Sequence, residues 1–302
     1  MALLELNIRS SIQFLVTNRV STPAAIEHTK MSNLEKTLQS HLDRRRASST
    51  LRNLTISPPH SVDFSSNDFL SLATSSALRS AYLKELQHGA PSSHLGSGGS
   101  RLLDGNSRYA EDLECDIAAF HGAPAGLLCN SGFDANSGLF ACVPQPGDVI
   151  LYDAFIHASV HDGMKLSRAA EKIAFEHNSV ADLERVLRWC LSRYGAIKSG
   201  QRNMFIAVEA VYSMDGDLAP LKEIVEVVER LLPEKNGHII VDEAHSTGVL
   251  GPKGRGLVCD LGLETKVFAR LHTFGKALAC NGGKLRPLAI LGRAFNPTGT
   301  SF

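Results

Sequence analysis

The sequence has few cysteines, and they show no pattern that would bind zinc or form a redox pair. There are six in 302 residues and no C-x-x-C pair, which excludes a zinc ribbon and a thioredoxin-like motif. Six cysteines in a chain of this length are also too dilute for the disulfide scaffold of a small secreted protein. We therefore expect buried free thiols in a reducing compartment, and a cytoplasmic protein.

An excess of one charge and a long apolar run are also missing. Lysine and arginine together number 31, as do aspartate and glutamate, so the formal net charge is zero. Proteins that bind phosphate backbones usually have a basic excess, so nucleic acid is not an expected partner. No run approaches the roughly 18 apolar residues of a membrane-spanning helix, so a membrane is not expected either.

The first 30 residues differ in composition from the rest of the chain. They are rich in Ser and Thr and hold more basic than acidic residues, namely Arg9, Arg19 and Lys30 against Glu5 and Glu27. This composition faintly resembles a transit peptide, and Met31 could be the initiator instead. A mitochondrial or peroxisomal location is therefore kept as the alternative to the cytoplasm.

Beyond Met31, short apolar runs alternate with helical patterns. Residues 32–52 predict a helix that Asn33 caps, with leucines 34, 38 and 42 on one face. Strands are expected at residues 125–129, 148–152, 205–210, 238–241 and 267–271, and the helices between them include residues 107–121, 180–193 and 221–232. This alternation predicts an α/β fold with a mostly parallel sheet flanked by helices.

Chemically unusual residues follow two of the expected strands. Asp242 comes directly after residues 238–241, and Lys276 lies one residue past a glycine turn after residues 267–271. Ligands of open α/β sheets bind beyond the carboxyl ends of the strands. Lysine is the residue that forms Schiff bases, because its pKa falls readily on burial. Taken singly, Asp242 could cap a turn and Lys276 could be an ordinary surface lysine.

Two further features suggest a phosphorylated planar ligand. Residues 130–136 (NSGFDAN) open a helical stretch whose backbone N–H groups suit a phosphate, although a simple N-cap gives the same pattern. His157 and His161 have metal-ligand spacing but no obvious third ligand, so we expect no metal and an imidazole packed on a planar group. Together with Asp242 and Lys276, this set matches what pyridoxal 5'-phosphate (PLP) requires.

Seven ordered segments of the chain resemble the α-oxoamine synthases, which are PLP-dependent enzymes of fold type I within aminotransferase class I/II. The segments are residues 63–73, 96–114, 130–136, 153–159, 209–221, 241–256 and 273–283. The resemblance implies an N-terminal extension and helix over residues 1–60 and a PLP-binding large domain over residues 61–283. It stops at a divergent tail, residues 284–302, so the family's small C-terminal domain is expected to be absent. Residues 288–291 could supply the next strand.

The resemblance also implies roles for individual residues. Lys276 matches the Schiff-base lysine that also removes the α-proton, Asp242 matches the partner of the ring nitrogen, and His157 matches the histidine stacked on the ring. The other cofactor-binding residues that it implies are Gly132, Phe133, Ser213, His245 and Thr273. The substrate-binding residues that it implies are Asn67, near the amino-acid carboxylate, and Arg52, which meets the acyl-CoA.

The activity that the resemblance implies is the decarboxylative condensation of an amino acid with an acyl-CoA. The absence of a membrane segment and of Cys-Pro dipeptides favours the family member of biotin synthesis, which uses L-alanine and pimeloyl-CoA. A glycine C-acetyltransferase-like synthase is the runner-up. The family is homodimeric, with the glycine-rich residues 96–101 at the subunit boundary. Because the family's carboxylate-binding arginine lies in the C-terminal domain, the alternative is an inactive fragment that binds PLP weakly or pairs with a full-length subunit.

Overall fold

The computed structural model describes residues 31–58, 60–88 and 96–286. The transit-peptide-like segment 1–30 and the possible strand 288–291 lie outside these ranges. The chain divides into two compact units, residues 1–62 and 63–302, and each is described by itself. The predicted domain boundaries stay predictions, although the last strand of the second unit continues to Arg286.

The described part of the first unit contains one helix, α2 (Asn33–Ala47). Ser32 caps it: the Ser32 Oγ accepts a hydrogen bond from the Glu35 N–H at 3.2 Å, and the Glu35 carboxylate accepts one from the Ser32 N–H at 2.6 Å. This reciprocal capping box satisfies two backbone donors at once. The prediction of Asn33 as the cap was therefore wrong by one residue.

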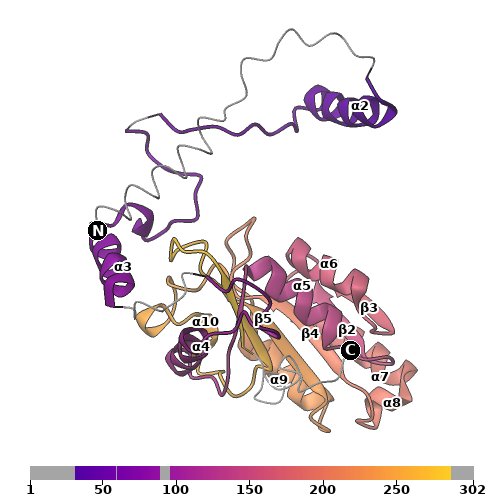
Figure 1. Cartoon of the computed structure of the whole chain (residues 1–302). Helices are drawn as coiled ribbons and strands as arrows, with labels where there is room; N and C mark the ends of the chain where they lie inside the picture. Colours follow the sequence, from indigo (N-terminus) through magenta and orange to yellow (C-terminus); the bar gives the residue numbers. More distant parts are fainter. Residues whose placement is uncertain (1–30, 59, 89–95, 287–302) are drawn as a thin grey trace. The chain divides into compact units, whose positions relative to one another are not determined.

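The second unit is built on a seven-stranded sheet with helices on both faces (Figure 1). The strands are β1 (Leu127–Cys129), β2 (Val149–Asp153), β3 (Glu171–Phe175), β4 (Met204–Glu209), β5 (Gly237–Asp242), β6 (Ala269–Thr273) and β7 (Gly283–Arg286). Their spatial order is β1-β7-β6-β5-β4-β2-β3, and β7 runs antiparallel to both of its neighbours while the pairs from β6 to β3 are parallel. The predicted α/β class with a mostly parallel sheet is confirmed.

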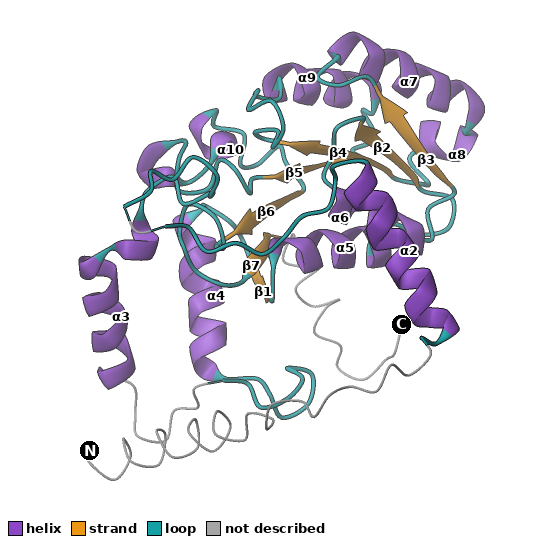
Figure 2. Ribbon diagram, turned by 90° about the horizontal axis from the view of Figure 1, so that it is seen from above, coloured by secondary structure: helices purple, strands orange, loops and turns teal. Residues whose placement is uncertain are grey.

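The helices of this unit cover the sheet in two layers. Figure 2 shows α7 (Val180–Arg193), α8 (Gly195–Lys198) and α9 (Leu221–Leu231) over one face, and α5 (Gly132–Cys142) and α6 (Ala158–Leu166) over the other. The unit also contains α3 (Ser76–His88), α4 (Arg108–Phe120), α10 (Leu257–Asp260) and two short 3₁₀ helices, η1 (Leu72–Thr74) and η2 (Pro252–Gly254).

Strand β4 shows why the central strands could be predicted from sequence. All six of its residues are buried. Ile206 and Val208 enter the core under α7 and α9, whereas Phe205 and Ala207 enter the core under α5 and α6. A strand that is buried on both faces forms a continuous apolar run, which is the pattern used above.

Strands β3 and β7 were not predicted. β3 is an edge strand, and only its last residue, Phe175, is buried, so it lacks the apolar run. β7 begins at Gly283, where an added Cβ would lie 2.5 Å from the Gly132 nitrogen. The close approach of two chain segments requires glycine there, and glycine is a poor indicator of a strand.

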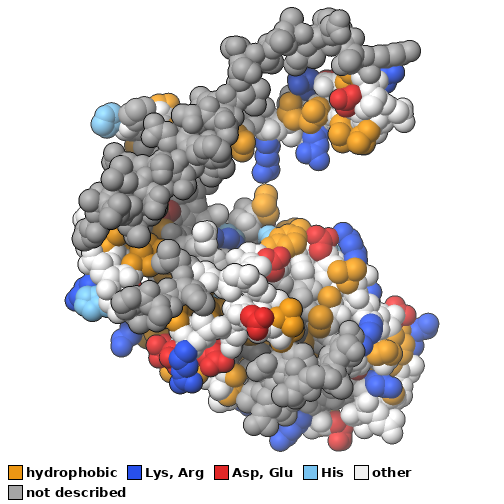
Figure 3. All heavy atoms as spheres, viewed as in Figure 1, with side chains coloured by type: hydrophobic (Ala, Val, Ile, Leu, Met, Phe, Trp, Pro, Cys, Tyr) orange, Lys and Arg blue, Asp and Glu red, His pale blue; other side chains and the backbone are white. Residues whose placement is uncertain are grey.

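The described residues test what the composition implied about surface charge and about buried thiols. Acidic and basic side chains are interspersed on the face seen in Figure 3, in keeping with the balanced composition. All six cysteines are free, but only Cys190 and Cys259 are buried, so the expectation of buried thiols was wrong for the rest.

Among the described helices, none has the length and apolar character needed to cross a membrane.

Candidate active site

Two buried carboxylates end neighbouring parallel strands. Glu209 and Asp242 are the last residues of β4 and β5 and are register partners, with 3% and 6% of their surface exposed. Burial, followed by the charge of Asp242, raises the pKa of Glu209 to about 8. Asp242 is held from two sides, because the Asn136 Nδ2 donates to it at 2.7 Å and the Ala244 N–H donates at 2.9 Å.

Lys276 and His245 meet beyond the ends of β6 and β5. The Lys276 Nζ lies 2.8 Å from the His245 Nε2. Burial lowers the pKa of Lys276, although the carboxylates of Asp242 and Glu209 oppose this shift. Burial, followed by the charges of Lys276 and His157, lowers the pKa of His245 to about 4. His245 is therefore a neutral acceptor near pH 7, facing an amine that loses its proton more readily than an exposed lysine.

His157 caps α6 and is connected to Asp242 through α5. The His157 Nδ1 accepts from the Ser159 N–H at 3.2 Å and lies 2.7 Å from the Ser159 Oγ. That hydroxyl in turn accepts from Asn136 at 3.0 Å. One buried amide thus fixes both Asp242 and the turn that carries His157. The Phe133 ring stands edge-on to His157, with 6.0 Å between ring centroids.

The N-terminus of α5 lies against the end of β6. Ser131 caps the helix by accepting from the Asp134 N–H at 3.0 Å. An added Cβ at Gly132 would stand 3.1 Å from the Thr273 Cβ, so glycine permits this close approach. The first N–H groups of a helix have no partner within the helix and favour an anion. A phosphate-sized anion is therefore the ligand that this end of α5 suits.

The structure brings most of the predicted site residues to one edge of the sheet. The contacts above connect Lys276 with His245, Asp242 with His157, His157 with Phe133, and Gly132 with Thr273. The roles that the resemblance gave to these residues stay predictions.

The other three predicted site residues lie at exposed positions. Ser213 occupies the turn after β4, at the same edge of the sheet, and Asn67 occupies the loop before η1. Arg52 follows α2 in the first unit. Their roles also stay predictions.

Three residues of this network were not predicted from the sequence: Asn136, Ser159 and Glu209. All three lie within segments that carried the resemblance, but none was given a role. Glu209 had a usable signal, because a carboxylate that ends a fully apolar run resembles Asp242. Asn136 and Ser159 had none, because their function depends on two helices meeting over the sheet.

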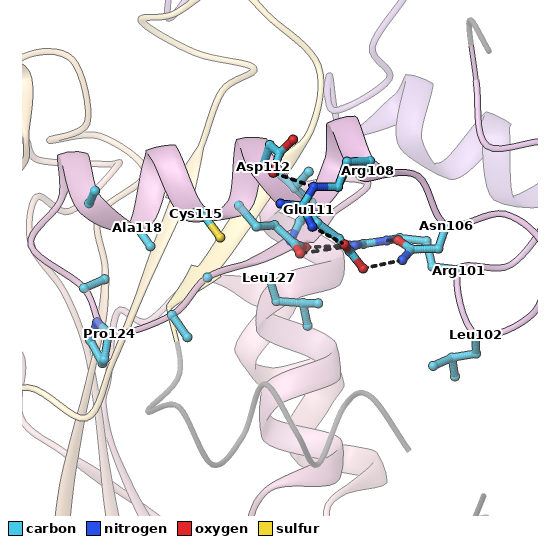
Figure 4. Close-up of a pocket in the computed structure, with 16 residues that line it drawn as sticks. Arg101, Leu102, Asn106, Arg108, Glu111, Asp112, Cys115, Ala118, Pro124 and Leu127 are labelled. Atoms are coloured by element: carbon cyan, nitrogen blue, oxygen red, sulfur yellow. Dashed lines mark hydrogen bonds and ion pairs between the residues drawn. The ribbon is translucent and has the colours of Figure 1, made fainter. Parts of the chain in front are cut away.

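A separate groove of about 710 Å³ lies between α4 and β1 (Figure 4). Arg101 anchors the glycine-rich loop there: it pairs with both oxygens of Glu114, which also accepts from the Leu128 N–H at 2.7 Å. None of the predicted site residues lines this groove.

The fold of this chain is shared with PLP-dependent enzymes of known structure. The structure superposes on a serine palmitoyltransferase of S. paucimobilis with a bound PLP–myriocin aldimine, with a TM-score of 0.68 and 27% identity over 85% of this chain and 66% of the other. The fold is therefore that of the fold type I PLP-dependent transferases. The family model for aminotransferase class I and II matches residues 59–285, and the chain belongs to that family.

Two relatives are more similar to this chain in sequence than the serine palmitoyltransferase is. The chain is 57% identical over 249 residues to an 8-amino-7-oxononanoate synthase of Emericella nidulans, covering 82% of this chain and 60% of that protein. It is 44% identical over 250 residues to the aminoacyl transferase sphA of Byssochlamys spectabilis, covering 82% of this chain and 53% of that protein. The chain thus spans little more than half the length of these relatives.

Proposed function

We propose that this chain binds PLP and belongs to an acyltransferase that condenses an amino acid with an acyl-CoA in biotin synthesis. One observation carries the proposal: the Lys276 amine lies 2.8 Å from the neutral imidazole of His245, at the sheet edge where Asp242 is fixed by Asn136. A lysine with a lowered pKa and an oriented carboxylate are the two groups that PLP chemistry demands of a protein.

The residues present fit PLP in their chemistry. The capped N-terminus of α5 would take the phosphate, with Gly132 and Thr273 in close contact beside it. The carboxylate of Asp242 would take the ring nitrogen, and the exposed imidazole of His157 would lie on the ring face. PLP supplies, when bound, an electron sink for the carbanion at the amino-acid α-carbon.

The side chains of this site can perform the proton transfers. Burial lowers the pKa of Lys276, so its amine would lose a proton more readily than that of an exposed lysine, both to bind the cofactor and to act as a base toward the α-proton. His245 can accept a hydrogen bond from that amine without competing for its proton, since its own pKa is about 4. The Asp242 carboxylate is oriented by its two donors, and a carboxylate in that position would favour a protonated ring nitrogen.

L-Alanine and pimeloyl-CoA are the substrates we propose. The 57% identity to the Emericella nidulans 8-amino-7-oxononanoate synthase supports them. An aminoacyl transferase acting on another pair of substrates is the second candidate, because the likeness to sphA covers the same share of this chain at 44% identity. We further propose a homodimer and a cytoplasmic location, with a mitochondrial or peroxisomal location as the alternative.

A substrate panel tests the activity. Purified chain with PLP is given L-alanine, glycine or L-serine, each with pimeloyl-CoA, acetyl-CoA or palmitoyl-CoA, and carbon dioxide and free CoA are measured. We expect the highest turnover with L-alanine and pimeloyl-CoA. Preference for another pair would contradict the substrate assignment, and PLP binding without any turnover would support the inactive alternative.

A further inference from the structure

His177 bridges two carboxylates on neighbouring segments of the sheet edge. Its Nδ1 lies 2.8 Å from the Asp153 Oδ1, and its Nε2 lies 2.8 Å from the Asp217 Oδ2. Asp153 is the last residue of β2, His177 follows β3, and Asp217 lies in the turn after β4. These three strands are adjacent in the sheet (Figure 2), so the bridge spans its outer part.

The ring is held in place from its faces as well as its nitrogens. Phe155 stacks on it with 4.2 Å between centroids and 18° between planes, and Tyr212 meets it edge-on at 4.5 Å. Only 19% of the His177 side chain is exposed. Such packing leaves the imidazole little freedom to turn away from either carboxylate.

Each carboxylate belongs to a segment that carries a predicted site residue. Asp153 lies four residues before His157, and its oxygens accept from the Phe155 N–H and the Asn178 N–H, both at 2.8 Å. Asp217 closes the turn that contains Ser213: its carbonyl accepts from the Tyr212 N–H at 3.0 Å, and the Tyr212 carbonyl accepts from the Gly216 N–H at 2.9 Å.

We propose that protonated His177 is a positioning residue that ties the turn 212–218 to the segment 153–157, and that its deprotonation loosens the turn. The positioning role rests on the proposed PLP site, because Ser213 and His157 matter only toward that cofactor. The reason lies in the chemistry of imidazole: both ring nitrogens donate when it is charged, and only one donates when it is neutral.

The surrounding charges decide which bond is lost. The carboxylates of Asp153 and Asp217 act on His177 directly, and Glu209 at the end of β4 and Tyr212 both face Asp153. Burial works to lower the pKa of His177, but the hydrogen bonds and charges of the two aspartates outweigh it, so the pKa is raised above 6.5. Asp153 is 1% exposed and keeps its two backbone donors, whereas Asp217 is 39% exposed, can be solvated and also accepts from the Asn178 Nδ2. The bond to Asp217 is therefore the one that breaks as pH rises through the raised pKa.

The test follows the turn and the ring separately, in the full chain. NMR of labelled histidine gives the pKa of His177, and hydrogen exchange gives protection factors for the Tyr212 and Gly216 amides from pH 6 to 9. We expect a pKa above 6.5 and protection that falls about tenfold across it. His177→Gln should show the lower protection at every pH, with the Asn178 donor to Asp217 left in place. Asp217→Asn should keep protection at high pH, because its amide can donate to a neutral imidazole. A pKa at or below 6.5, or a turn whose protection ignores pH, would overturn the proposal.

A cofactor titration tests the connection to the site. His161→Gln on α6 is the matched control, since the His161 ring contacts Tyr152 rather than the bridge. We expect the PLP dissociation constant to rise about fivefold or more in His177→Gln and to stay unchanged in the control. Equal PLP affinity in His177→Gln and the parent chain would overturn the positioning role. No PLP binding by the parent chain would refute the proposed function instead, while the NMR and exchange results would still decide the bridge.

Discussion

Replacing Asn136 with alanine should damage the site more than its effect on stability explains. Asn136 is 2% exposed, and its Nδ2 donates to Asp242 at 2.7 Å and to the Ser159 Oγ at 3.0 Å. A hydrogen bond to a charged group contributes about 1.5–3 kcal/mol, and one to a neutral group contributes about 0.5–1.5 kcal/mol. The free energy of unfolding should therefore fall by about 2–4.5 kcal/mol.

The matched control is Asn236→Ala. Asn236 is 4% exposed, and its Nδ2 donates to the Ile197 and Arg202 carbonyls at 2.8 and 2.7 Å, away from the site. It should cost about 1–3 kcal/mol of stability, because both bonds are to neutral groups. Only Asn136→Ala frees the Asp242 carboxylate and the turn that carries His157, so only it should weaken PLP binding, by about tenfold or more.

Urea unfolding gives the stability of each variant, and a PLP titration of folded protein gives the dissociation constant. Equal losses of PLP affinity in the two variants would contradict the role of Asn136 in the site, because the effect would then follow stability alone. An Asn136→Ala variant with unchanged PLP affinity would refute it as well.

Three further predictions follow from single positions. Glu209→Gln should stabilise the protein by several kcal/mol more at pH 9 than at pH 6. The protonated Glu209 carboxyl, whose pKa is raised from 4.5 to about 8, contributes stability that is complete below pH 4.5 and is lost as pH rises through 8. If urea unfolding gave parallel curves of stability against pH for the variant and the parent chain, that result would contradict this prediction. Gly132→Ala places a Cβ 3.1 Å from the Thr273 Cβ and should lower the affinity for PLP. Gly138→Ala lies in the same helix, meets nothing within 4 Å and should stabilise the protein by about 0.5–1 kcal/mol. Similar effects of the two variants in PLP titration and thermal unfolding would count against the tight contact at Gly132. The parent chain should lose stability as pH falls from 6.5 toward 4, because the His245 imidazole is buried in its neutral form, and His245→Gln should not show this loss. If the free energy of unfolding of the variant fell equally over this pH range, another group would be its cause.

The chemistry of the strand ends could be predicted because it is local in sequence. Asp242 and Lys276 each follow an apolar run, and the runs are visible because residues on both faces of β5 and β6 are buried. Strand β3 could not be found in this way, since an edge strand with one buried residue has no apolar run.

The supporting network could not be predicted because it is not local. Asn136 and Asp242 are 106 residues apart, and His177 and Asp217 are 40 apart. Nothing in the sequence near these residues shows that they meet, and only the packing of α5 and α6 on the sheet and the order of β2, β3 and β4 bring them together.

Peptide mapping of the lysine that carries PLP tests the central claim most directly. The chain is loaded with PLP, reduced with borohydride, digested, and its labelled peptides are identified by mass spectrometry, with Lys276→Ala treated in parallel. We expect one labelled lysine, Lys276, and no stoichiometric label in the variant, because Lys276 combines a lowered pKa with a place beside Asp242 and His245. Stoichiometric label on another lysine, or label that survives in Lys276→Ala, would contradict the assignment of the site.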